Sequence, residues 1–161
     1  MHGFVGRERE LAALRRMVER VAAGGRAGRP GRALLVRGRR RVGKSRLVEE
    51  FLDRSGLPHV YFTASALTSV AADLEMFVEA GRTSSLPDAD RFTGQAPRTW
   101  DAALSLLSSA VPADRPSVVV LDELPYLVAN DPAWKALSRR SSTGSCRAAR
   151  CCSSASVRTS R

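Results

Sequence analysis

The 161-residue sequence lacks several features that would place it in particular classes of protein. It has no run of 18 or more apolar residues, so no segment is predicted to span a membrane. Its first residues do not form a basic segment leading into an apolar stretch, which argues against secretion and favours a cytoplasmic location. Its three cysteines, Cys146, Cys151 and Cys152, have no histidine or second cysteine pair at metal-binding spacing, so neither a zinc site nor a disulfide framework is predicted.

Lysine is also scarce, since only Lys44 and Lys135 stand among the 26 basic residues. The net charge is +10, but residues 138–161 hold six arginines and no acidic residue. Without that segment the chain has 20 basic and 16 acidic residues, a balance of +4 that is ordinary for a soluble domain. The charge therefore gives only weak support to a nucleic-acid partner.

The most informative stretch is residues 38–45, Gly-Arg-Arg-Arg-Val-Gly-Lys-Ser. It lies between an apolar run at 33–36, which predicts a buried strand, and residues 46–52, whose apolar side chains share one helical face. This is the G-x-x-x-x-G-K-[ST] pattern, or Walker A motif, in the context that it requires. Backbone N–H groups of such a loop surround phosphates, together with the positive end of the following helix. We expect Lys44 to reach the β- and γ-phosphates, and the Ser45 hydroxyl to hold Mg²⁺.

A second signature follows in residues 118–123, Val-Val-Val-Leu-Asp-Glu. Four consecutive apolar residues predict a strand buried on both faces of a parallel sheet. Ligands of open α/β sheets bind outside the carboxyl ends of the strands, where Asp122 and Glu123 would lie beside the phosphate loop. This pair is typical of a Walker B motif. We expect Asp122 to hold the Mg²⁺ shell and Glu123 to act as the general base toward the attacking water.

Hydrophobic periodicity places the remaining elements of an α/β fold. It predicts a helix of about four turns around Leu11–Val21, a strand at 59–63, a helix at 69–81 and a loop at 81–97. It also predicts a helix beginning at Pro97, an exit from the strand at 124–127, and a further helix capped by 130–132. Trp100 is expected in the core rather than in base stacking.

Four segments in order, residues 4–11, 36–47, 60–62 and 118–127, resemble the archaeal-type AAA+ ATPases of prokaryotes, which are P-loop proteins related to the STAND signalling ATPases. The resemblance covers residues 3–137. It implies a parallel sheet flanked by helices, of the AAA+ or ASCE-like P-loop type, with ATP and Mg²⁺ as ligands. It also implies that Phe4 to Arg7 lie near the adenine. The predicted cofactor-binding residues are Val5, Gly6, Gly38, Arg39, Arg40, Arg41, Val42, Gly43, Lys44, Ser45 and Arg46, with Ser45 and Asp122 as the magnesium pair, and Glu123 and Lys44 as the catalytic residues.

The family pattern stops after Leu137, and residues 138–161 contain one valine but no leucine, isoleucine or aromatic residue. We therefore interpret 1–137 as the N-terminal portion of the ATPase domain. We interpret 138–161 as an out-of-frame or truncated ending or as a native disordered tail. Members of this family place a sensor strand between the strands at 33–36 and 118–121, and we expect nothing in 138–161 to form it. The sheet is thus predicted to be incomplete, with a gap or unpaired edges there.

Three functions remain open at this point. The chain is an ATPase that couples Mg-ATP binding and hydrolysis to a conformational change, or a nucleotide-binding switch with little turnover, or it has an accessory DNA-binding role through Arg39, Arg40, Arg41 and the tail. A homo-oligomer or a protein partner is compatible with each.

Overall fold

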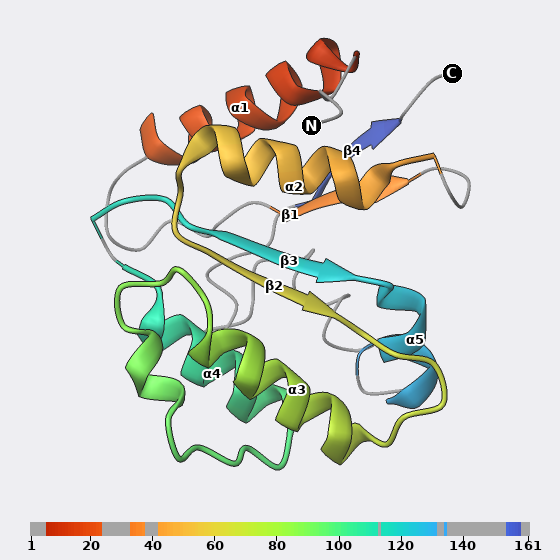
Figure 1. Cartoon of the computed structure of the whole chain (residues 1–161), viewed down its shortest axis with the longest axis vertical. Helices are drawn as coiled ribbons and strands as arrows, with labels where there is room; N and C mark the ends of the chain where they lie inside the picture. Colours follow the sequence, from red (N-terminus) through yellow and green to blue (C-terminus); the bar gives the residue numbers. More distant parts are fainter. Residues whose placement is uncertain are drawn as a thin grey trace.

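The computed structural model describes residues 6–23, 33–37, 42–112, 114–131, 134 and 154–158 (Figure 1). The elements in chain order are α1 (Glu8–Ala23), β1 (Ala33–Arg37), α2 (Lys44–Ser55), β2 (His59–Thr63), α3 (Val70–Arg82), a 3-10 turn (Ala89–Phe92), α4 (Trp100–Ala110), β3 (Val118–Asp122), α5 (Leu124–Asn130) and β4 (Ser154–Arg158). None of the helices in these ranges is long and apolar enough to cross a membrane. The predicted strands at 33–36, 59–63 and 118–121 and the helix at 69–81 are confirmed, with ends that shift by no more than one residue.

The strands form two parallel pairs, as expected for an α/β fold. β2 lies beside β3, with Tyr61 opposite Val120 and Thr63 opposite Asp122. β1 lies beside β4. Among the described residues no hydrogen-bonded ladder joins these two pairs, so β1 and β3 are not neighbours in one sheet. This agrees with the predicted incompleteness of the sheet between the strand before the phosphate loop and the strand that ends in Asp122.

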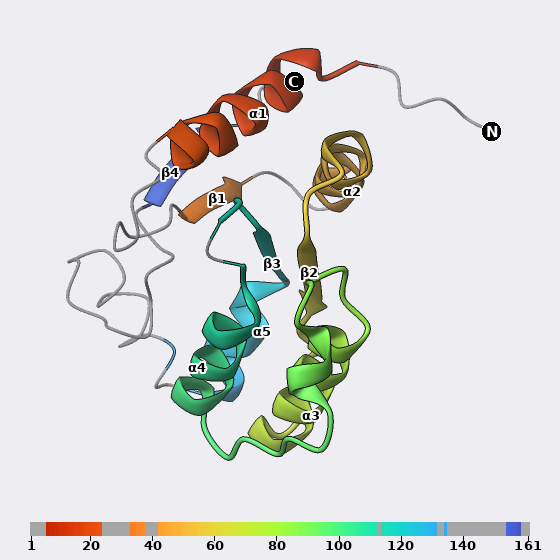
Figure 2. The same cartoon turned by 90° about the vertical axis from the view of Figure 1, so that its left-hand side faces the viewer.

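β4 lies in the segment 138–161, where the sequence was expected to offer nothing that could form the sensor strand. Ser154–Arg158 pairs with β1 in parallel along all five residues. This segment has few apolar side chains, but strand pairing is made by main-chain N–H and C=O groups, which every residue except proline supplies. In both views β1 lies between β4 and the β2–β3 pair, so β4 does not take the place of the sensor strand (Figures 1 and 2).

The β2–β3 pair is covered on both faces, which gives three layers (Figures 1 and 2). Alternate residues Val60 and Phe62 face α3 and α4, and belong to the larger core cluster. In that cluster Trp100 is 2% exposed and meets Phe62 and Phe77 edge to face, which confirms that it is a core residue. The opposite face packs on α1 and α2 through a second cluster, which contains Leu11, Leu14, Leu47, Phe51 and Leu52 with Tyr61, Val118 and Val120 against them.

Helix ends differ from the sequence prediction where side chains compete for the caps. α4 begins at Trp100 rather than at Pro97, because the Thr99 hydroxyl accepts the N–H of Ala102 and caps the helix there. Residues 124–127, predicted as the exit from the strand, are the first turn of α5. Asp131, predicted to cap a following helix, is also the C-cap of α5. Its carbonyl oxygen accepts the N–H of Trp134, which is helical, and the rest of that predicted helix lies outside the described residues.

β3 is less buried than its sequence indicates. All five of its residues are half-buried, although an apolar run of this kind predicts full burial. Only one of its two edges is paired in the described structure, by β2. Both faces of β3 are covered, as predicted, by one core cluster each, but the cover is partial, because burial of a strand depends on its neighbours as well as on its own side chains.

Candidate functional site at the carboxyl ends of the strands

The site is built around a contact between two residues far apart in the sequence. The Ser45 hydroxyl, in the first turn of α2, donates a hydrogen bond of 2.7 Å to Oδ2 of Asp122, the last residue of β3. The two residues that the sequence assigned to one magnesium ion are thus brought together. Both side chains offer oxygen, the donor type that Mg²⁺ prefers.

The N-terminal turn of α2 lies beside this pair. Gly43 precedes the helix in a left-handed conformation, with φ of 74°, and supplies no side-chain cap. The first N–H groups of a helix have no partner within the helix, and they carry the positive end of its dipole. Lys44 is half-buried in this turn, whereas Arg46 is exposed and forms an ion pair of 3.6 Å with Glu49. The backbone here suits an anion.

Arg7 connects the N-terminal segment to the same turn. Its guanidinium donates to the carbonyl oxygens of Val42 and, at 3.5 Å, of Gly43. Gly6, which precedes it, is exposed and has φ of 92°. The segment predicted to lie near the adenine therefore reaches the last residues of the phosphate loop.

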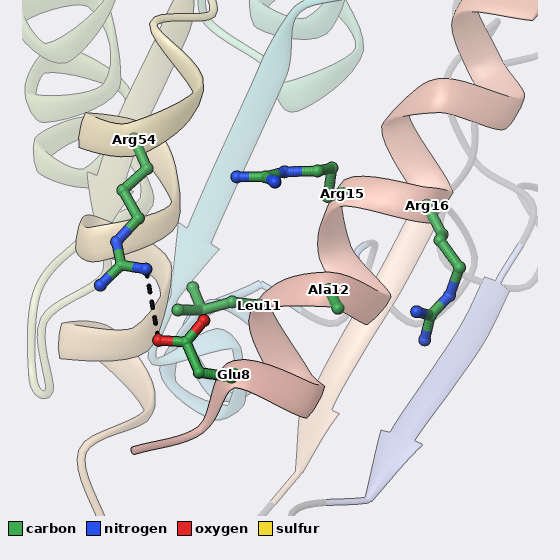
Figure 3. Close-up of a pocket in the computed structure, with 6 residues that line it drawn as sticks. All are labelled: Glu8, Leu11, Ala12, Arg15, Arg16 and Arg54. Carbon is green, nitrogen blue, oxygen red and sulfur yellow. Dashed lines mark hydrogen bonds and ion pairs between the residues drawn. The ribbon is translucent and has the colours of Figure 1, made fainter. Parts of the chain in front are cut away.

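An exposed ion pair connects α1 to α2 next to Arg7. Glu8 accepts from Arg54 at 3.4 Å (Figure 3). Arg54 also binds Glu50, one turn earlier in α2, at 2.7 Å. The groove in Figure 3 lies along this junction, with Arg15 and Arg16 among the residues that line it. It is separate from the Ser45–Asp122 pair, which contributes no residue to it.

Glu123 follows Asp122 in a left-handed conformation, with φ of 53° and ψ of 38°. Its N–H donates to Oδ1 of Asp122 at 2.9 Å, and its side chain is exposed. Within the described parts of the chain no hydrogen bond or ion pair holds the Glu123 carboxylate. This carboxylate is accordingly open to a water molecule.

Tyr61 is a member of the site that sequence reasoning missed. Its hydroxyl donates to Oδ2 of Asp122 at 2.9 Å. The period-two pattern of β2 places Tyr61 on the face opposite Val60 and Phe62, toward α2. The pairing register of β2 with β3, which decides that this face meets Asp122, has no signal in the sequence.

These contacts set the charge of the site. Burial raises the pKa of Asp122, but the hydrogen bonds from Ser45, Tyr61 and the Glu123 amide, with the charge of Lys44, outweigh burial and hold that pKa below its usual value. Burial, followed by the hydrogen bond to Asp122, raises the pKa of Tyr61 to about 12. At neutral pH Asp122 is therefore a carboxylate, and Tyr61 is a protonated donor.

Five predicted cofactor-binding residues, Val5, Gly38, Arg39, Arg40 and Arg41, lie outside the described residues. The structure places the other predicted site residues around the start of α2 and the end of β3. Those near the loop are Gly6, Val42, Gly43, Lys44, Ser45 and Arg46, and those after β3 are Asp122 and Glu123.

Comparison with known proteins adds one finding. The family model described as "AAA ATPase domain" matches residues 3–143, which is most of the chain. The comparisons with curated proteins and with solved structures give no match. The motifs at residues 38–45 and 118–123, the parallel strands between helices and the match over 3–143 agree, and the chain belongs to the AAA ATPase domain family.

Proposed function

We propose that this chain binds Mg-ATP at the start of α2 and hydrolyses it to ADP and phosphate, and that this cycle drives a conformational change. Membership of the AAA ATPase domain family supports ATP binding, usually with Mg²⁺. The observation that carries the specific site is the contact of 2.7 Å between Ser45 Oγ and Asp122 Oδ2, which joins the two motifs across 77 positions of sequence.

The residues present fit the predicted ligands. Ser45 and the ionised Asp122 provide oxygen donors for Mg²⁺, and the uncapped first turn of α2 provides N–H donors for phosphate oxygens. When bound, Mg²⁺ would neutralise negative charge that develops on the phosphate oxygens during transfer. Lys44 would add its positive charge at the β- and γ-phosphates.

Glu123 is the proposed general base. Its carboxylate lies next to Asp122 but is free of the hydrogen bonds that occupy both Asp122 oxygens. It would accept a proton from the attacking water while that water's oxygen bonds to phosphorus. The two adjacent carboxylates thus have different roles: Asp122 would orient the ion, and Glu123 would accept the proton.

A second candidate is a nucleotide-binding switch with little turnover. The separation of the strands favours it, because β1, which leads into the phosphate loop, and β3, which ends in Asp122, belong to different pairs. A site divided between two sheets is less firmly preorganised for the transition state than one on a continuous sheet, and preorganisation dominates catalysis of phosphoryl transfer.

Binding and turnover of ATP separate these candidates. We expect the wild-type chain to bind a fluorescent ATP analogue with Mg²⁺, and Lys44→Ala to lose most of that affinity. Lys135→Ala, which removes the only other lysine, is the matched control and should bind like wild type. Absence of binding by the wild-type chain would contradict both candidates.

Phosphate release then decides between hydrolysis and switching. Glu123→Gln keeps the size of the side chain but cannot accept the proton, so binding should persist while turnover falls by about 10²–10⁴-fold. Wild-type turnover no faster than that of Glu123→Gln would favour the switch.

A further inference from the structure

Tyr61 approaches the predicted magnesium pair from a strand that carries no nucleotide-binding motif. Its hydroxyl lies 2.9 Å from Oδ2 of Asp122, and the Ser45 hydroxyl lies 2.7 Å from the same oxygen. Two donors from β2 and α2 therefore meet on one acceptor at the end of β3. Among the described contacts, both hydroxyls bind Oδ2 of Asp122. The other carboxylate oxygen, Oδ1, accepts the N–H of Glu123.

This arrangement fixes the rotation of the Asp122 carboxylate. With the Glu123 amide on Oδ1 and two hydroxyls on Oδ2, the carboxylate cannot turn without breaking hydrogen bonds on both oxygens. The Ser45 hydroxyl points its hydrogen at Oδ2, so the orientation of Asp122 also decides where the lone pairs of Ser45 Oγ point. Those lone pairs are what a magnesium ion would bind.

The environment of Tyr61 suits its hydroxyl to orienting the Asp122 carboxylate rather than to taking part in a reaction. Its ring packs against the cluster of α1 and α2, which limits the movement of the hydroxyl. β2 and β3 are paired in parallel, with Tyr61 opposite Val120, two residues before Asp122. The donor and the acceptor are thus carried on neighbouring strands that main-chain hydrogen bonds join.

We propose that Tyr61 is a positioning residue of the magnesium site: its hydroxyl holds the Asp122 carboxylate, and through it the Ser45 hydroxyl, in the orientation that binds the ion. This inference rests on the proposed function. Tyr61 acts through Asp122 and touches neither the ion nor the nucleotide.

The test measures how strongly Mg²⁺ improves the affinity for a fluorescent ATP analogue. Tyr61→Phe removes the hydroxyl and keeps the ring. We expect its affinity in excess Mg²⁺ to be about tenfold weaker than that of wild type, the scale of one hydrogen bond to a charged group in a half-buried site. In EDTA the affinities of the two proteins should be equal. A merely structural defect would weaken binding in both conditions.

Thr68→Val is the matched control. The Thr68 hydroxyl donates to the carboxylate of Asp73 at 2.8 Å, so its loss removes the same kind of hydrogen bond at a place away from the magnesium pair. The ratio of affinities with and without Mg²⁺ should stay at the wild-type value in Thr68→Val. In the Asp122→Asn background, Tyr61→Phe should have no further effect on that ratio, because the acceptor is already altered.

The outcomes are distinct. If wild type shows no Mg²⁺-dependent binding, the proposed function fails and the role of Tyr61 fails with it. If wild type shows this dependence and Tyr61→Phe shows the same ratio, only the role of Tyr61 is overturned. A second measurement keeps the Tyr61 hydroxyl and so does not depend on the folding of a variant. With 3-fluorotyrosine incorporated, the ¹⁹F resonance of residue 61 should shift when Mg²⁺ is added to the nucleotide complex. A resonance that does not move would overturn the proposal.

Discussion

Glu123 stands in a backbone conformation that is unfavourable for its own side chain, and this leads to an unusual prediction. With φ of 53° and ψ of 38°, it occupies the left-handed region that glycine adopts freely. Replacing the proposed general base by glycine should therefore stabilise the fold while it abolishes turnover. Most substitutions instead lower the free energy of unfolding.

The magnitude follows from two opposing terms. The left-handed conformation costs a residue with a β-carbon roughly 1–2 kcal/mol, and Glu123→Gly would recover this cost. Glycine also gives the unfolded chain more freedom, which removes about 0.5–1 kcal/mol of the gain. The Glu123 side chain is exposed, so little packing is lost. The free energy of unfolding should rise by about 0.5–1 kcal/mol.

Glu123→Gln is the control for this comparison. It loses the same charge beside Asp122 but keeps the β-carbon, so its stability should stay within about 0.5 kcal/mol of wild type. Urea unfolding of the three proteins without nucleotide measures the difference, and phosphate release measures turnover. If Glu123→Gly were less stable than wild type, the left-handed conformation would not hold in solution. If it hydrolysed ATP at the wild-type rate, Glu123 would not be the base.

Two further substitutions test the packing that supports the site. Gly81→Ala should lower the free energy of unfolding by about 1–2 kcal/mol, although alanine favours helices, because its β-carbon would overlap the buried ring of Phe92. Ala71→Gly on the exposed side of the same helix calibrates the helix-propensity term, and a Gly81→Ala protein as stable as wild type in urea would contradict the predicted clash. Asn130→Ala should cost about 1–3 kcal/mol in the same assay, because the fully buried Asp73 carboxylate loses the amide that donates to it at 2.9 Å. An unchanged free energy would mean that water replaces that amide.

The elements with strong local signals were predictable from the sequence. The apolar runs before the phosphate loop and before Asp122, and the helical stripe at 69–81, each encode their structure in a few adjacent residues. Helix ends were less predictable, because the first residue of a helix depends on which of several nearby polar groups accepts its free N–H groups. Thr99, rather than Pro97, sets the start of α4 for this reason.

Burial and strand pairing depended on distant parts of the chain. The five residues of β3 are apolar enough for a central strand, yet they are half-buried because the pairing described for β3 covers one edge. β4 forms from residues with little apolar character, since main-chain hydrogen bonds to β1 do not require it.

The sequence by itself determined the candidates for the proposed site: the residues predicted to contact phosphate, to offer oxygen ligands for Mg²⁺ and to supply a carboxylate base. These follow from residue type and local spacing, so Lys44, Ser45, Asp122 and Glu123 could be named without coordinates. Only the tertiary structure decided which groups meet. The hydrogen bond of Tyr61 to Asp122 depends on the register between two strands more than fifty residues apart, and such a register is fixed by packing of the whole domain, not by any local pattern.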